Sequence, residues 1–192
     1  MADLISKIKG VDNVTYDLQD KVSIFGGTNL LIGSKLYTKN NPFSYTSTAK
    51  DGYTYINTML TSEPLISGQN YIIQCKTNGT WAASHGSQAT SNVTLWLVTG
   101  ATISENTFHY NFTTSGGAGT YLGNGQWKWT CPSGSNGLYG HIRINNYNTD
   151  GTTSVTHTYW DFKIEKGNKP TEWTPAPQDL VTYSSETLEF FQ

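Results

Sequence analysis

The sequence is poor in charge of either sign. Only 14% of its 192 residues are Asp, Glu, Lys or Arg, and the formal net charge is -2 at pH 7. The basic residues are scattered rather than clustered. Proteins that bind nucleic acid usually carry a basic patch that neutralises phosphates. The composition therefore argues against nucleic acid as a partner.

Long apolar runs are missing as well. No stretch approaches the roughly 20 residues that a membrane-spanning helix needs. The opening residues, MADLISKIKG, have no apolar centre of the kind that a secretion signal has. We therefore predict a soluble protein that is made in a cytoplasm and has no membrane partner.

Cysteine is scarce, with Cys75 and Cys131 as the two in the chain. Two thiols in unrelated segments give neither a disulfide framework nor a zinc site. Strand alternation places Cys75 on the same side as Tyr71 and Ile73. We predict that both thiols are free and buried.

Recognisable catalytic patterns are also missing. Glycoside hydrolysis usually needs two carboxylates that flank one bond. The acidic residues considered for that role lie in separate segments: Glu63, Glu105, Asp150, Asp161 and Glu165. The histidines show no HExxH spacing, and no Gly-x-Ser-x-Gly elbow or phosphate loop occurs. We predict a protein that is not an enzyme, with no catalytic residues, no metal ligands and no cofactor.

What the chain does contain is 19 Gly and 12 Tyr, with Thr, Ser and Asn through most of its length. This composition is typical of all-β proteins with many turns. Short strand-like runs are separated by Gly-, Asn- and Ser-rich turns, as in a β-sandwich. The strands are expected near residues 54–57, 70–76, 92–98, 107–112, 126–131, 139–146 and 157–164.

Residues 1–27 follow a different pattern. Apolar residues recur there in four- and three-residue steps if Thr15 fills one place: Leu4, Ile8, Val11, Leu18, Val22 and Phe25. The pattern predicts a helix of about three heptads through which the chain self-associates into a homo-oligomer. Gly10 and the pair Asp12-Asn13 weaken it, and a helix packed on the domain or a linker is the alternative.

We therefore divide the chain into three parts. Residues 1–27 form the N-terminal helical or linker segment, and residues 28–179 form the β-sandwich. Residues 180–192 are either a C-terminal extension or a remnant of an expression tag, since LEFFQ resembles what a site-specific protease leaves behind.

The strand YGHIRINNYN, residues 139–148, has an unusual second face. Alternation puts Ile142 and Ile144 on one side, and the polar members of the strand on the other. These polar members are His141, Arg143, Asn145 and Tyr147. A saccharide offers paired hydroxyls and weakly apolar C–H faces, so its sites combine aromatic rings with bidentate polar groups. This strand supplies that mixture.

Other strands can be sorted by the same alternation. Val93, Leu95 and Leu97 are expected in the core, which turns Trp96 outward with Thr94 and Val98. In WDFKIEK, the expected core members are Trp160, Phe162 and Ile164, and the outward ones are Tyr159, Asp161 and Lys163. Trp127 and Trp129 share a face, and one or both are expected in the core.

The candidate saccharide site is the outward face of the sandwich. Its leading residues are Trp96, Arg143, Asn145 and Tyr147, and its outer candidates are His141, Trp81, Tyr159 and Asp161. Loops or a neighbouring subunit covering this face is the alternative. A register error of one residue would move each side chain to the opposite face.

The segment WDFKIEKGNKPTEWTPAPQD, residues 160–179, carries a resemblance. Its final strand, its turn at residues 168–170, its Glu172-Trp173 pair and its Pro-Ala-Pro exit resemble the C-terminal end of a known group of modules. These are the carbohydrate-binding modules of tail and baseplate proteins, of the evolved distal tail or baseplate accessory type, from phages of Gram-positive bacteria. TNLLIGS and GQWKWTCPSG resemble their opening strand and penultimate region, so the resemblance spans roughly residues 28–179.

The resemblance implies a jelly-roll β-sandwich that binds saccharide without catalysis. It implies a place in the virion, at the tail tip or baseplate, after synthesis in the host cytoplasm. The partners would be cell-wall saccharide of a Gram-positive host and other phage tail proteins. Similar jelly rolls often hold a structural calcium ion, but the sequence shows no ligand set for one.

Two other functions stay open. A structural baseplate or fibre component would bind only its own assembly, whereas a lectin-like module would bind an isolated glycan. A depolymerase would release products from a wall polysaccharide.

Overall fold

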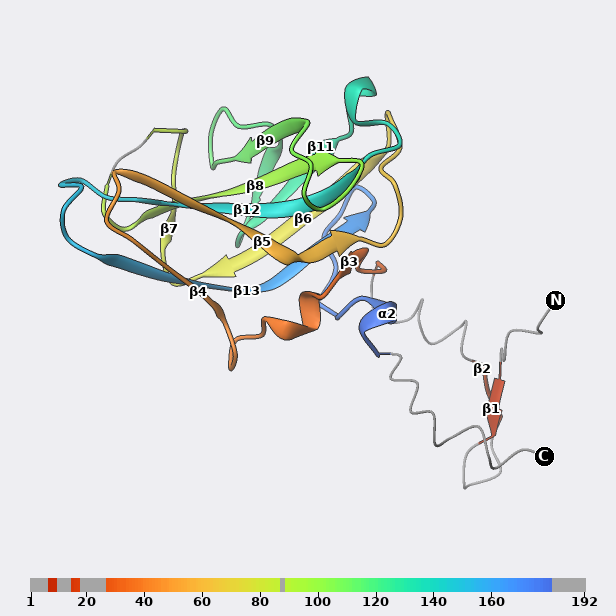
Figure 1. Cartoon of the computed structure of the whole chain (residues 1–192). Coiled ribbons are helices and arrows are strands. Elements are labelled where there is room, and N and C mark those ends of the chain that lie inside the picture. Colours follow the sequence, from red (N-terminus) through yellow and green to blue (C-terminus); the bar gives the residue numbers. More distant parts are fainter. Residues whose placement is uncertain (1–6, 10–14, 18–26, 87–88, 181–192) are drawn as a thin grey trace.

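The computed structural model describes residues 7–9, 15–17, 27–86 and 89–180. Strands make up about half of this part of the chain (Figure 1). The elements in order are β1 (Lys7–Lys9), β2 (Thr15–Asp17), β3 (Leu31–Ile32), η1 (Ser34–Leu36), β4 (Phe43–Ser47), β5 (Asp51–Thr61), β6 (Asn70–Thr77), β7 (Thr80–Trp81), β8 (Asn92–Gly100), β9 (Phe108–Phe112), β10 (Thr120–Gly123), β11 (Gln126–Thr130), η2 (Ser133–Ser135), β12 (Tyr139–Tyr147), β13 (Val155–Lys166) and α2 (Pro177–Leu180). Each of the expected strand regions coincides with an observed strand.

Two larger sheets form the body of the described residues. One has the order β10-β11-β6-β13-β4, and the other has the order β3-β5-β12-β8-β7, with β9 paired to β8. Nearly all the pairings are antiparallel, and β7 with β8 is parallel. The two sheets form the layers in Figure 1. The expected all-β sandwich is confirmed at this level, while the jelly-roll type stays a prediction.

The core lies between the two sheets. Leu95 and Ile144 enter it from one sheet, and Ile73, Trp127 and Ile164 enter it from the other, all with no exposed surface. Full burial of such a side chain stabilises the fold by about 1.5–3 kcal/mol. The predicted inward positions in β8 are confirmed, and both tryptophans of β11 lie in the core. The two cysteines are free and buried, as predicted.

Strand β13 contradicts the simple alternation. Tyr159 is fully buried in the core, whereas Trp160 is only partly buried and lies outside it. The register to β6 shifts between Trp160 and Lys163, and Asp161 takes the left-handed conformation with φ 55°. An extra residue at a β-bulge reverses the side-chain phase. The prediction of Trp160 inward and Tyr159 outward is therefore wrong, while Phe162 stays inward as expected.

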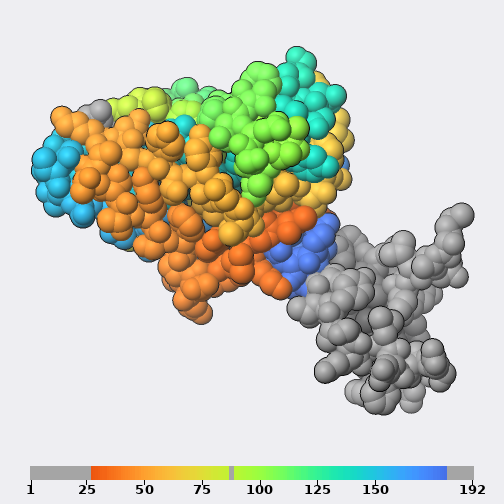
Figure 2. Space-filling view, viewed as in Figure 1, coloured from red at the N-terminus to blue at the C-terminus, as the bar shows by residue number. Residues whose placement is uncertain are grey.

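The two ends of the sandwich domain lie close together. The carboxylate of Asp179 accepts hydrogen bonds from the backbone of Gly33 at 2.7 Å and Lys35 at 3.2 Å. The backbone N–H of Gly27 donates to the hydroxyl of Thr171 at 2.8 Å. Figure 2 shows the blue C-terminal residues against the orange-red residues near β3.

The predicted N-terminal helix is not confirmed. Within residues 1–27, β1 and β2 pair antiparallel, with Lys7 opposite Asp17, and most of the heptad positions lie outside the described residues. Among the described residues, no helix has the length and apolar character to cross a membrane. The predicted domain boundaries stay predictions.

Candidate functional site

The outer face of the sheet containing β12 gathers side chains from neighbouring strands. Arg143 on β12 lies opposite Tyr55 on β5 and Trp96 on β8. Two residues further along β12, Asn145 lies opposite Tyr53 on β5 and Thr94 on β8. The predicted outward phase of Arg143 and Trp96 is confirmed, because both strands are regular where they pair.

Arg143, the chain's single arginine, is held between aromatic rings. Its guanidinium carbon lies 3.9 Å from the ring centre of Tyr53, 4.6 Å from Trp96 and 5.9 Å from Tyr55. Cation–π contacts of this kind contribute about 0.5–2 kcal/mol each. Its Nε donates to Asn145 Oδ1 at 3.0 Å. Its terminal amino groups donate no hydrogen bond to any residue that the structure describes, and the side chain is partly exposed.

Asn145 links the arginine to a carboxylate. Its Nδ2 donates to Asp51 Oδ1 at 2.7 Å, and Asp51 Oδ2 lies 3.8 Å from Nε2 of His85. Asn145 is fully buried, whereas Asp51 and His85 are exposed. Asn145 therefore cannot reach a ligand from its observed position, and it instead fixes the orientation of Arg143.

Tyr147 is also covered. Its hydroxyl lies 3.3 Å from Thr94 Oγ1 and accepts from the backbone N–H of Gly86 at 3.4 Å. Burial raises its pKa, so the phenol is neutral at pH 7. Trp96 Nε1 donates to the same Thr94 hydroxyl at 3.0 Å. Gly86, which precedes β8, thus contacts Tyr147, and Thr94 on β8 holds the Trp96 ring in place.

His141 is buried near the start of β12, at the opposite end of the strand from Tyr147. Its Nε2 lies 2.9 Å from Asn106 Oδ1, and its Nδ1 has no hydrogen-bond partner among the described residues. Burial, aided by nearby His109, lowers its pKa to about 4. His141 is therefore neutral at pH 7, and its Nε2 donates to Asn106. Like Asn145, it supports the face from beneath.

We call the surface formed by Tyr53, Tyr55, Trp96 and Arg143 the tyrosine–arginine face. Tyr53 is 52% exposed, and the other three are partly exposed. His109 borders it, with Nε2 3.2 Å from the Tyr55 hydroxyl. Sequence reasoning missed both tyrosines. It began the strand at residue 54, which left out Tyr53, and it did not sort the side chains of this strand by face, which left out Tyr55. The alternation in DGYTYINT, extended back to Asp51, would have found them.

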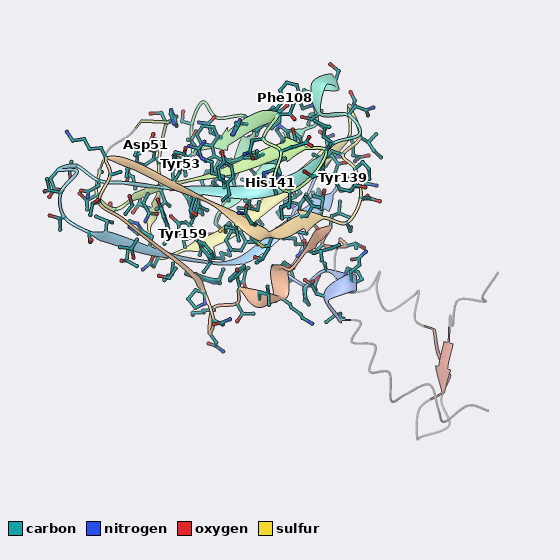
Figure 3. The ribbon with its side chains drawn as sticks, viewed as in Figure 1. Asp51, Tyr53, Phe108, Tyr139, His141 and Tyr159 are labelled. Atoms are coloured by element: carbon teal, nitrogen blue, oxygen red, sulfur yellow. The ribbon has the colours of Figure 1, made fainter. Side chains whose placement is uncertain are left out.

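Three predicted site residues lie away from this face. Trp81 packs edge-on against core Trp127, with ring centres 5.0 Å apart. Tyr159 lies in the core, where its hydroxyl donates a hydrogen bond to Asn146 Oδ1. Figure 3 shows Tyr159 apart from Asp51 and Tyr53. Asp161 lies on the five-stranded sheet.

Among the described residues, no group of three or more His, Cys, Asp or Glu side chains is placed to hold a metal ion. No model of a known protein family matches this chain, and no curated protein matches it.

Proposed function

We propose that this protein is a non-catalytic carbohydrate-binding module and that the tyrosine–arginine face is its saccharide site. The observation that carries the proposal is the clamped guanidinium of Arg143. It is fixed between Tyr53 and Trp96 while its terminal amino groups make no bond within the described residues.

The face matches the surface chemistry of a sugar. Arg143 can donate two parallel hydrogen bonds to neighbouring hydroxyl oxygens or to a charged substituent such as phosphate. The exposed ring of Tyr53 offers an apolar surface to C–H groups. His85 and Asp51 at the edge add a donor or acceptor and a carboxylate. Recognition of this kind needs no reacting group.

We further propose that the module is a jelly roll of a phage tail or baseplate protein that attaches the virion to cell-wall saccharide of a Gram-positive host. The resemblance of residues 160–179 supports this assignment. Each hydrogen bond to a sugar exchanges one with water and yields only about 1 kcal/mol. Several copies on one tail would raise avidity by roughly 10² to 10⁴ without new contacts.

The test is calorimetric titration with polysaccharide extracted from Gram-positive cell walls. Wild type, Arg143→Ala and Tyr53→Ala are compared with Lys128→Ala, which removes a partly buried cation from the other sheet. Saturable heat that both face variants lose and the control keeps is the expected result. Full binding by the two variants would move the site elsewhere. No heat with any variant or with wild type would favour a structural tail component, and reducing ends released by wild type would favour a depolymerase.

A further inference from the structure

A hollow lies on the opposite side of the sandwich from the tyrosine–arginine face. It has a volume of about 340 Å³, within the lower range of pockets that bind small molecules. Strands β6, β11 and β13 form its floor, and the segment after β13 forms one wall. Its lining residues are Gln74, Lys76, Asn124, Gln126, Asp161 and residues 170–173.

Asp161 occupies the most constrained position in this hollow. Its backbone has φ 55°, a left-handed conformation that most side chains rarely adopt and that Asp and Asn tolerate best. Its N–H donates to the carbonyl of Tyr37 at 3.0 Å, and its carbonyl accepts from Gln74 Nε2 at 3.4 Å. Its partly buried carboxylate accepts no hydrogen bond from the described residues. The bulge thus fixes an acceptor that has no partner within the described residues.

The floor around this carboxylate is ordered by hydrogen bonds. Gln126 Nε2 donates to Gln74 Oε1 at 2.8 Å. Lys76 Nζ donates to the carbonyl of Asn124 at 2.8 Å, which leaves further N–H groups on the ammonium. Amide, ammonium and carboxylate groups therefore face the same hollow, with charges of both signs.

The wall is held by a buried ion pair. Lys163 Nζ lies 3.0 Å from Glu165 Oε2, and both side chains are almost fully buried. Lys163 also donates to the carbonyl of Glu172 at 2.7 Å, and Glu165 Oε1 accepts from the N–H of Thr171 at 2.9 Å. Trp173 Nε1 donates to the carbonyl of Phe162 at 3.0 Å, which fixes the indole in the wall.

We propose that this hollow is a second ligand site, which takes one neutral hydroxylated ring, that is, a single monosaccharide unit. Asp161 accepts hydrogen bonds from two neighbouring hydroxyls, Lys76 donates to a ring substituent, and the Trp173 indole bounds the C–H side. The mixed charges favour a neutral polar ligand over an anion or a cation. The volume suits one ring rather than a chain.

This site is independent of the tyrosine–arginine face, because the two lie on different sheets of the sandwich. A module with both sites can contact two saccharide segments at once. Linked contacts of this kind strengthen attachment without any change in either site.

The test is two-dimensional NMR of the labelled full chain during titration with glucose, galactose, rhamnose and N-acetylglucosamine. Concentrations run to about 100 mM, because single-ring contacts of millimolar affinity saturate in that range. For at least one sugar we expect saturable shifts of the Trp173 indole and of the Gln74 and Gln126 amides. Arg143→Ala keeps these shifts, so a failure of the first site would not hide the second.

Asp161→Asn is the decisive variant, because Asn also tolerates the left-handed backbone and the fold is kept. We expect at least a tenfold loss of affinity in this variant and none in Glu105→Gln, which removes an exposed carboxylate elsewhere. The proposal is overturned if no sugar shifts these signals, if the shifts fall only on the tyrosine–arginine face, or if Asp161→Asn binds like wild type.

Discussion

Replacement of Asn145 by Ala tests whether a buried amide organises the tyrosine–arginine face. Asn145 accepts from Arg143 Nε at 3.0 Å and donates to Asp51 Oδ1 at 2.7 Å. Hydrogen bonds to charged groups contribute about 1.5–3 kcal/mol each. Arg143 and Asp51 both reach solvent, so water replaces part of the loss. We expect the free energy of unfolding to fall by about 2–3 kcal/mol, and Tm to fall by about 4–12 °C for a domain of this size.

The assay combines urea unfolding with titration of the wall polysaccharide. Affinity is expected to fall along with stability, although Asn145 has no exposed surface, because Arg143 loses the bond that fixes its plane. Thr130→Ala is the control, since it removes a hydrogen bond to Asn70 at an exposed site on the other sheet. A loss below about 0.5 kcal/mol, the range of ordinary surface substitutions, would refute the role given to Asn145.

Three further predictions concern the ring, the histidine and a turn. Tyr53→Phe should retain most saccharide affinity and Tyr53→Ala should lose at least fivefold by calorimetry, because the ring contacts Arg143 and, in the proposed site, also the ligand. Equal losses would mean that the hydroxyl matters instead. His141 has a folded pKa of about 4 against 6.5 in the unfolded chain, so the unfolded state binds more protons below pH 6.5 and stability falls between pH 6.5 and 4, by up to about 3 kcal/mol. Burial also lowers the pKa of His109 and of His157, so part of the pH dependence remains when His141 is replaced. The free energy of unfolding should therefore fall less steeply with falling pH in His141→Gln than in wild type. Equal slopes in the two proteins would contradict the assignment. Gly125→Ala should cost at least about 2 kcal/mol in thermal unfolding, because φ is +71° and the new Cβ would lie 2.0 Å from the Cys75 carbonyl oxygen. Gly137→Ala, with φ +78° and open space, should cost about 1 kcal/mol, and equal costs would show that the close contact relaxes.

The sequence allowed prediction of the face wherever strands alternate without interruption. In β8 and β12 the apolar residues mark the core side, so Trp96 and Arg143 follow directly. In β13 the bulge at Asp161 reverses the phase, and no local pattern in WDFKIEK announces it. The errors at Tyr159 and Trp160 follow from that one extra residue.

The burial of a side chain was harder to predict than the face of the sheet to which it points. Alternation correctly gave Asn145 and Tyr147 the same side as Arg143, but both are fully buried. The cover over Tyr147 includes Gly86, which lies 61 residues earlier in the chain. Contacts of that sequence separation depend on the path of loops across the sheet, which a single strand's pattern does not encode.

The stacking of Arg143 bears directly on how a weak site can still be selective. A free arginine side chain loses about 2 kcal/mol of rotamer entropy when a ligand orders it. Here Tyr53, Trp96 and Asn145 already order the guanidinium in the folded protein. Less of the interaction energy is therefore lost on binding, which is the general advantage of a preorganised site. The fixed plane of the guanidinium also demands a matching pair of acceptors on the ligand. Saccharides that differ in the orientation of one hydroxyl should consequently bind this face with different affinities, even where the total number of hydroxyls is the same.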